Sequence, residues 1–202
     1  METDLFFIRH GETEWNKKLI YQGQTDIDLN DTGYKQARLL KERLTDKDID
    51  RIYTSDLKRA YNTASIVAEP HNKKLIKEEN LREISFGDWE GMNFTEIQEE
   101  DPETYNEWRK DPISISPPNG ENFSDFQKRV ISIVNKIKDL HTGERVAIIA
   151  HGGTIRVYLA HILGMDLKGN RMLSVHNTSV SHLKMYDNRP VLKLLNSTCH
   201  LD

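Results

Sequence analysis

The sequence contains two apolar runs that end in the same way, LFFIRHGET at residues 5–13 and VAIIAHGGT at residues 146–154. Each run has the length of a short, fully buried strand, and each passes directly into a histidine followed by a glycine. Parallel strands of an open α/β sheet present their carboxyl ends at one edge, where ligands bind. The pattern therefore predicts a sheet that brings His10 and His151 together at its ligand-binding edge.

Helical and strand patterns alternate along most of the chain. Strand followed by helix, repeated, is typical of an α/β domain with a mostly parallel sheet. The C-terminal pattern differs, because two strand-like runs joined by DNRP indicate an antiparallel edge. We therefore expect a three-layer sandwich with helices on both faces of the sheet. The other expected elements are a weaker strand at 51–55, helices at 34–44, 57–68 and 123–140, and strands at 179–186 and 191–195.

Polar residues precede two of these helical patterns and are candidate N-caps. Asn30 or Asp31 stands before the helix at 34–44, and Ser55 or Asp56 stands before the helix at 57–68. A capping oxygen accepts a hydrogen bond from an N–H group of the first turn, which the helix itself cannot satisfy. We therefore expect both helices to begin with a side-chain cap.

The segment 86–119 has no strand pattern and holds aromatic residues among many acidic ones. We interpret it as a mostly helical cap insertion across one end of the sheet. Because 202 residues fit one ordinary domain, we expect a single domain over 1–202 with this insertion at about 86–119. The aromatic residues Phe86, Trp89, Phe94 and Trp108 are expected to form core more than a substrate platform.

Composition narrows the class of partner. The net charge of −4 and the pI near 6.1 make the chain a poor general binder of polyanions, so we expect no nucleic-acid partner. Its apolar runs fall short of the roughly 20 residues that span a bilayer, and METDLFF lacks the features of a secretory signal. We therefore expect a cytoplasmic protein without a membrane partner. Oligomeric state stays open between monomer and homodimer.

Two arginines and a glycine pair complete a pattern for binding phosphate. Arg9 precedes the first histidine, and Arg59 falls near the start of the helix that follows the middle strand. Gly152 and Gly153 would open a helix whose free N–H groups favour an anion. Guanidinium groups bind phosphate oxygens in a bidentate manner and stay charged. Alternatively, Arg59 could lie on the helix surface and pair with Asp56.

The two histidines and one glutamate supply the chemistry of phosphoryl transfer. A neutral imidazole can attack phosphorus and hold the group covalently, and we take His10 as that nucleophile. His151, protonated when phosphate is bound, would stabilise charge on the transferring group. Glu83, in LREISFGDWEG, is the candidate acid for the departing alcohol, with Asp88 and Glu90 as acidic competitors.

Nothing in the sequence predicts a metal or another cofactor. Neither the single cysteine nor the spacing of the remaining histidines fits a metal site. These histidines are His71, His141, His161, His176, His182 and His200.

Four motifs together resemble the histidine phosphatase superfamily, in its phosphoglycerate mutase-like branch. They are RHGETEWN, YTSDLKRAYNTA, LREISFGDWEG and HGGTIR, in that order along the chain. The resemblance implies an α/β sheet flanked by helices and a metal-independent phosphohistidine intermediate. It implies His10 as the phosphorylated residue and Glu83 as the proton donor. Arg9, Arg59 and His151 are implied as phosphate ligands, and Asn16 and Gln22 match positions that also approach the phosphate.

Within this branch the chain is most similar to broad-specificity phosphatases and α-ribazole phosphatases, on FGDWEG and PPNGENFSDFQKRV. We expect a phosphoric monoester hydrolase acting on a small phosphorylated metabolite, with an α-ribazole phosphatase of cobalamin biosynthesis as the alternative. A phosphoglycerate mutase is disfavoured because no arginine or lysine follows Glu83 until Arg109. A non-catalytic binder of phosphorylated ligands also stays open. The acidic residues of the cap predict a preference for esters with a neutral or apolar leaving group.

Overall fold

The computed structural model describes residues 2–187 and 189–202, and a six-stranded sheet forms its centre. Neighbouring strands follow the order β3-β2-β4-β1-β5-β6. The first four strands of this order are parallel, β5 runs antiparallel to β1, and β6 runs antiparallel to β5. This confirms the mostly parallel sheet with an antiparallel edge. The strands are β1 (Glu2–Arg9), β2 (Arg51–Thr54), β3 (Leu75–Lys77), β4 (Arg145–Ala150), β5 (Val180–Tyr186) and β6 (Arg189–Ser197).

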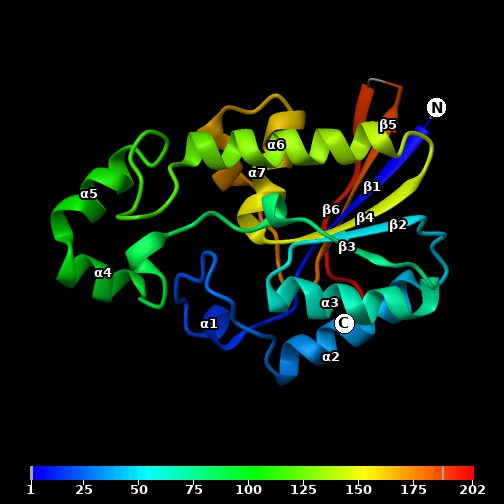
Figure 1. Ribbon diagram of the computed structural model, residues 1–202, viewed down its shortest axis with the longest axis horizontal. Coiled ribbons are helices and arrows are strands. Elements are labelled where there is room, and N and C mark those ends of the chain that lie inside the picture. The colour runs from blue at the N-terminus through cyan, green and yellow to red at the C-terminus, as the bar shows by residue number, and fades with distance from the viewer. Residues whose placement is uncertain (1, 188) are drawn as a thin grey trace.

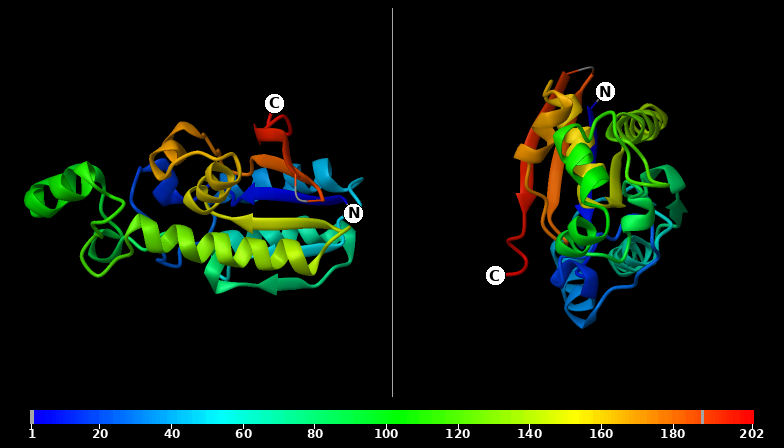
Figure 2. Two further views of the ribbon diagram at one scale, coloured as in Figure 1. Left: turned by 90° about the horizontal axis from the view of Figure 1, so that it is seen from above. Right: turned by 90° about the vertical axis from the view of Figure 1, so that its left-hand side faces the viewer.

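Helices cover both faces of the sheet, as Figures 1 and 2 show. Side chains of β1 alternate between the faces: Leu5 and Phe7 pack with α6 and α7, whereas Phe6 and Ile8 pack with α2 and α3. The expected three-layer sandwich is therefore confirmed. The helices are α1 (Glu14–Lys17), α2 (Asp31–Leu44), α3 (Lys58–Ala68), α4 (Phe94–Glu100), α5 (Pro102–Lys110), α6 (Phe123–Leu140) and α7 (Gly152–Ile162).

One of the two predicted helix N-caps is confirmed. Asn30 caps α2, because its side-chain oxygen accepts a hydrogen bond of 2.8 Å from the Gly33 N–H. The prediction for α3 is wrong, since its N-cap is Leu57, whose side chain accepts no hydrogen bond, and the Lys58 N–H of the first turn donates to Asp26 at 2.7 Å instead. Asp56 instead forms an ion pair with Arg82, which removes its carboxylate from the helix end. The expected turn DNRP includes Asn188, which lies outside the described residues.

Two elements were not expected from the sequence. Strand β3 has only three residues and lies in the lysine-rich stretch KKLIKEE, which shows no strand periodicity. It forms because its backbone pairs in parallel with β2, from Ile52 opposite Leu75 to Thr54 opposite Lys77. Helix α1 is a single turn and is fixed by a capping box between Thr13 and Asn16. Both elements thus depend on hydrogen bonds more than on an apolar pattern.

The turn after β1 packs closely against the start of α2. A Cβ atom added to Gly11 would lie 2.6 Å from the carbonyl oxygen of Gly33, and one added to Gly33 would lie 2.1 Å from that of Glu12. Side chains at these two positions would therefore force the backbones apart. The missing Cβ atoms let the chain leave His10 in a tight, fixed turn.

Helices α4 and α5 lie at one end of the molecule, beyond the sheet (Figure 1). They carry a small core of their own, in which the rings of Trp89 and Trp108 meet edge to face with centroids 5.3 Å apart. Tyr105 and Ile97 complete this core. Phe94 is 54% exposed and does not belong to it. None of the helices in the described ranges has both the length and the apolar composition that a membrane crossing requires.

Candidate active site

The structure brings the two histidines together at the carboxyl edge of the sheet. Arg9 is opposite Ala150 in the parallel pairing of β1 with β4, and the N–H of His10 donates to the Ala150 carbonyl at 3.0 Å. The rings of His10 and His151 therefore lie side by side, with centroids 5.2 Å apart. Both side chains are buried.

The hydrogen bonding of His10 fixes its tautomer. Its Nδ1 lies 2.7 Å from the carbonyl oxygen of Gly11. A carbonyl oxygen can only accept, so Nδ1 carries the proton and Nε2 keeps its lone pair. Burial, and next the charges of Arg59 and Arg9, hold the pKa of His10 well below its ordinary value of 6.5. At neutral pH the ring is uncharged and has one basic nitrogen.

His151 has the opposite tautomer. The Nε of Arg59 donates to Nδ1 of His151 at 3.3 Å, so the neutral ring carries its proton on Nε2. Burial, followed by the charge of Arg59, also holds the pKa of His151 well below 6.5. His151 is therefore a neutral N–H donor in this structure. The expectation of a protonated ring applies only where a bound dianion raises its pKa.

Arg59 is buried in the first turn of α3, and is not a surface residue. It does not pair with Asp56, which contacts Arg82 instead. Its two terminal nitrogens donate to the carbonyls of Thr25 at 2.8 Å and Gly23 at 2.6 Å. Burial lowers its pKa to about 10, so the guanidinium stays charged at neutral pH.

Arg9 is a second buried guanidinium at this edge. It donates from Nη1 to the Val175 carbonyl at 2.8 Å, and burial lowers its pKa to about 10. Its Nε is buried and has no hydrogen-bond partner among the described residues. The same holds for Nε2 of His151 and for Nε of Arg156. Unpaired buried donors are costly, and the oxygens of an anion would satisfy them.

Asn16 and Gln22 lie at the same edge, in the segment that follows β1. The hydroxyl of Thr13 lies 3.2 Å from Oδ1 of Asn16 and 3.1 Å from Oε1 of Gln22. Asn177 also donates to Oδ1 of Asn16, at 3.2 Å, and to the His10 carbonyl at 3.0 Å. Because the amide oxygens are used within the protein, the amide nitrogens of Asn16 and Gln22 are the atoms that can donate to a ligand.

Glu83 points its carboxylate at the N-terminus of α7. One oxygen accepts from the Gly153 N–H at 2.8 Å, and the other accepts from the Ile84 N–H at 3.0 Å. Its acidic competitors lie elsewhere: Glu90 accepts from the N–H groups of Gln24 and Thr25, and Asp88 accepts from Asn119. Glu83 is the carboxylate beside the two histidines.

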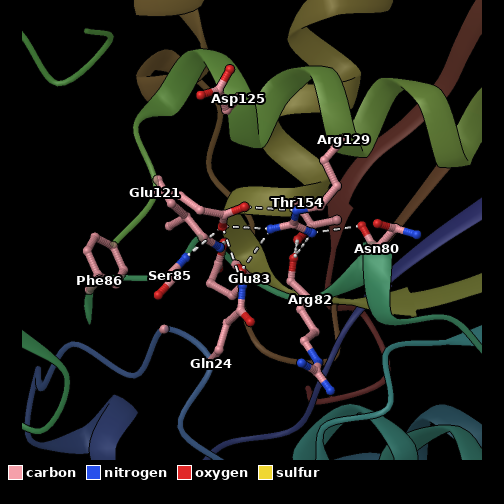
Figure 3. Close-up of polar contacts among 12 residues, drawn as sticks. Gln24, Asn80, Arg82, Glu83, Ser85, Phe86, Glu121, Asp125, Arg129 and Thr154 are labelled. Atoms are coloured by element: carbon pink, nitrogen blue, oxygen red, sulfur yellow. Dashed lines mark hydrogen bonds and ion pairs between the residues drawn. The ribbon is translucent and has the colours of Figure 1, made fainter. Parts of the chain in front are cut away.

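The backbone around Glu83 is held by an ion pair between Arg129 of α6 and Glu121 (Figure 3). Arg129 donates to the carbonyls of Asn80, Arg82 and Glu83 at 2.9, 3.1 and 3.3 Å. Glu121 accepts from the Ser85 N–H at 2.9 Å. This network fixes the chain on both sides of Glu83.

A cavity of about 610 Å³ lies at this edge of the sheet. Its polar end contains Arg9, His10, Arg59, Glu83 and His151, and Asn16 and Gln22 also line it. Of the predicted glycine pair, Gly153 lines the cavity, whereas Gly152 lies against the Arg9 side chain. The remaining wall is largely apolar: Trp15, Leu19, Ile20, Tyr21, Ile84, Phe86, Phe94 and Phe123.

Two of the lining residues carry polar groups at this edge that the sequence did not single out, namely Arg156 and Asn177. Arg156 was part of the motif HGGTIR, so its helical spacing from His151 was the available signal. Asn177 lies in the segment before β5, outside the four motifs, and no sequence pattern pointed to it. Among the described residues, no group of three or more His, Cys, Asp or Glu side chains could hold a metal ion.

The burial of neutral His10 predicts a loss of stability in acid. An unfolded histidine binds a proton below pH 6.5, whereas His10 in the native state does not, so unfolding becomes easier as pH falls below 6.5. For His10→Gln, we expect the fall in unfolding free energy between pH 7 and 5.5 to be smaller by about 1 kcal/mol. Urea titrations in phosphate-free buffer would measure it. His161→Gln, at an exposed position, is the control, and equal falls in both variants would contradict the prediction.

Comparisons of the chain with known proteins agree on one family. The model of the histidine phosphatase superfamily (branch 1) matches residues 5–198. The chain is 36% identical to phosphoserine phosphatase 1 of Hydrogenobacter thermophilus, over 98% of this chain and 93% of the relative. It is 32% identical to the metal-independent phosphoserine phosphatase of Arabidopsis thaliana, over 98% and 83%. It is 31% identical to the adenosylcobalamin/alpha-ribazole phosphatase of Salmonella typhimurium, over 96% of each chain.

Relatives named as phosphoglycerate mutases match as well. Among solved structures, phosphoserine phosphatase of Entamoeba histolytica in complex with 3-phosphoglyceric acid superposes with a TM-score of 0.88 at 29% identity, covering 99% of this chain and all of that one. The family and its phosphatase relatives place the chain among the phosphoric monoester hydrolases. The expected resemblance is confirmed: this chain belongs to branch 1 of the histidine phosphatase superfamily.

Proposed function

We propose that the protein hydrolyses small phosphomonoesters through a phosphohistidine on His10, without a metal. The observation that carries the proposal is the fixed tautomer of a neutral His10, whose Nε2 lone pair is available beside two buried guanidinium groups. A neutral imidazole nitrogen is a competent nucleophile for phosphorus. The name of the Arabidopsis relative, a metal-independent phosphatase, agrees with a reaction that needs no metal ion.

The proposed reaction has two steps. The phosphoryl group binds to Arg9, Arg59 and Nε2–H of His151, with the amides of Asn16 and Gln22 and the N–H groups at the start of α7 nearby. Nε2 of His10 forms a bond to phosphorus as the ester P–O bond breaks, and Glu83 gives its proton to the departing alcohol. Glu83 then takes a proton from water, which attacks phosphorus and releases phosphate and free His10.

The nucleophile is tested by phosphate release from para-nitrophenyl phosphate in excess EDTA. We expect the wild type to stay active in EDTA and His10→Ala to lose at least about a thousandfold in kcat, as expected when a nucleophile is removed. Brief reaction and denaturation should leave an acid-labile phosphate on wild-type His10, seen by mass spectrometry. Unchanged turnover in the variant would contradict the assignment, and wild-type inactivity would favour a binder or a mutase.

The proton-donor role of Glu83 is tested at Gly153. A Cβ atom at this position would lie 2.1 Å from Oε1 of Glu83, so Gly153→Ala should displace the carboxylate. We expect about a 100-fold loss with an alkyl phosphate, within the usual range for a general acid, and a much smaller loss with para-nitrophenyl phosphate, whose leaving group needs no proton. At Gly152 a Cβ atom would lie 3.5 Å from Arg9, an ordinary contact, so Gly152→Ala should keep the wild-type ratio of the two rates. Equal losses on both substrates in Gly153→Ala would contradict the role.

An α-ribazole phosphatase is the second candidate. It is supported by the Salmonella relative and by the aromatic side chains of Trp15, Phe86, Phe94 and Phe123 in the cavity wall, on which a base can stack. This role predicts a kcat/KM for α-ribazole phosphate at least about tenfold above that for phosphoserine, the value of one stacking contact. Steady-state kinetics on the two esters would measure the ratio. A ratio below one would favour an enzyme for smaller esters.

A further inference from the structure

The segment 176–179 lies against the end of β1 and holds the backbone of His10. The antiparallel pairing of β1 with β5 ends one residue before Arg9, so the carbonyls of Arg9 and His10 lie beyond that ladder. The Thr178 N–H donates to both carbonyls, at 3.0 and 3.3 Å. The backbone that carries His10 is therefore fixed by this segment on one side and by its own N–H bond to β4 on the other.

Thr178 has a backbone conformation that a β-branched residue rarely adopts. It is fully buried, and its φ of 53° lies in the left-handed region. Such a conformation persists only where the surrounding bonds over-determine it. Here the Thr178 hydroxyl donates to the Asn177 carbonyl at 2.8 Å and accepts from Nε2 of His200 at 3.2 Å. The strained turn lets two consecutive residues, Asn177 and Thr178, donate to the same carbonyl, that of His10.

The side-chain amide of Asn177 connects the backbone of His10 to the side chain of Asn16. An amide nitrogen carries two hydrogens, and that of Asn177 has two acceptors. These are the His10 carbonyl at 3.0 Å and Oδ1 of Asn16 at 3.2 Å. Both donors of Asn177 are thus used within the protein, and a single side chain joins the proposed nucleophile to a proposed phosphate ligand.

The bond from Asn177 also helps to fix the orientation of the Asn16 amide. Oδ1 of Asn16 accepts from the Asn177 amide and from the N–H of Thr13, each at 3.2 Å. If the Asn16 amide turned over, its NH2 group would face both of these donors and leave them unpaired, which is unfavourable. With Oδ1 held in this way, Nδ2 of Asn16, a residue that lines the cavity, stays available to a phosphoryl oxygen.

We propose that Asn177 is a positioning residue, which keeps Nε2 of His10 in line with a phosphoryl group held by Asn16. This inference rests on the proposed function, since it takes His10 as the nucleophile. In-line attack depends on the relative placement of the two reacting groups, and a displacement of about 1 Å can cost roughly 100-fold in rate. Asn177 is neutral and acts through two other residues, so it sets their geometry and adds little to the affinity for phosphate.

The test is Asn177→Ala, with para-nitrophenyl phosphate as the substrate and inorganic phosphate as a competitive inhibitor. We expect kcat/KM to fall by about 10- to 100-fold, as for misplacement of a reacting group. The inhibition constant of phosphate should change by less than about threefold, because the charged ligands Arg9 and Arg59 stay in place. Asn177→Asp keeps the size of the side chain but has no N–H group, so its kcat should fall at least as far. It provides the same test if the alanine variant does not fold.

A double-mutant cycle with Asn16→Ala tests whether the two amides act together. Because Asn177 acts partly through Asn16, its substitution should cost less in the Asn16→Ala enzyme than in the wild type, by at least roughly threefold. Circular dichroism would confirm that each variant is folded.

Asn196→Gly is the matched control for the stability of the segment 176–179. It removes the bond of 2.6 Å that the His176 N–H donates to the Asn196 side chain, and glycine tolerates the φ of 51° at that position. The segment thus loses a contact that does not involve His10. We expect kcat/KM of this variant to stay within about threefold of the wild type.

A phosphate inhibition constant that rises in step with the fall in kcat/KM would overturn the inference and make Asn177 a phosphate ligand. Unchanged turnover in Asn177→Ala, losses that multiply fully in the double variant, or an equal loss in Asn196→Gly would overturn it too. In each of these cases, turnover by the wild type that is lost in His10→Ala leaves the proposed function standing. A wild type that releases no phosphate from this ester would overturn the proposed function, and the inference with it.

Discussion

The burial of the Arg59 guanidinium is the constraint on which the site depends. A buried cation is tolerated only where acceptors surround it. The carbonyls of Gly23 and Thr25 and Nδ1 of His151 meet that need. The loop that carries those carbonyls is in turn held by Glu90, which accepts from the Gln24 and Thr25 N–H groups. Glu90 is thus used to support Arg59, which explains why it does not compete with Glu83.

Burial and the same charges determine the state of both histidines. Burial is the main reason that the pKa of each ring is lowered, and the charges of Arg59 and Arg9 lower it further. The rings have opposite tautomers because Nδ1 of His10 donates to the Gly11 carbonyl, whereas Nδ1 of His151 accepts from Arg59. One neutral ring offers a lone pair and the other offers an N–H group. Under the proposed function, the cationic pocket that binds phosphate therefore also provides a nucleophile and a neutral donor from the same residue type.

Much of this arrangement was predictable because it follows from strand ends. The apolar runs before His10 and His151 predict two buried strands, and parallel pairing then brings the histidines together. Strand β3 and the cap of α3 were not predictable, since both depend on tertiary hydrogen bonds without a local pattern. Asn177 lies 167 positions after His10 in the sequence, and its side-chain amide donates to the His10 carbonyl. A contact of this kind leaves no periodic signal in one sequence.

Glu83 differs from the histidines in how it is held. No buried strand ends at it, and its backbone is fixed by Arg129 on α6 and by Glu121, where the chain returns from the cap. The aromatic core around Trp89 and Trp108 takes no part in these hydrogen bonds, although Phe86 packs against it. Within α4 and α5, Phe94 is the residue that lines the cavity. Under the proposed function, a substitution at Phe94 therefore changes the apolar wall of the cavity and leaves the hydrogen bonds around Glu83 in place.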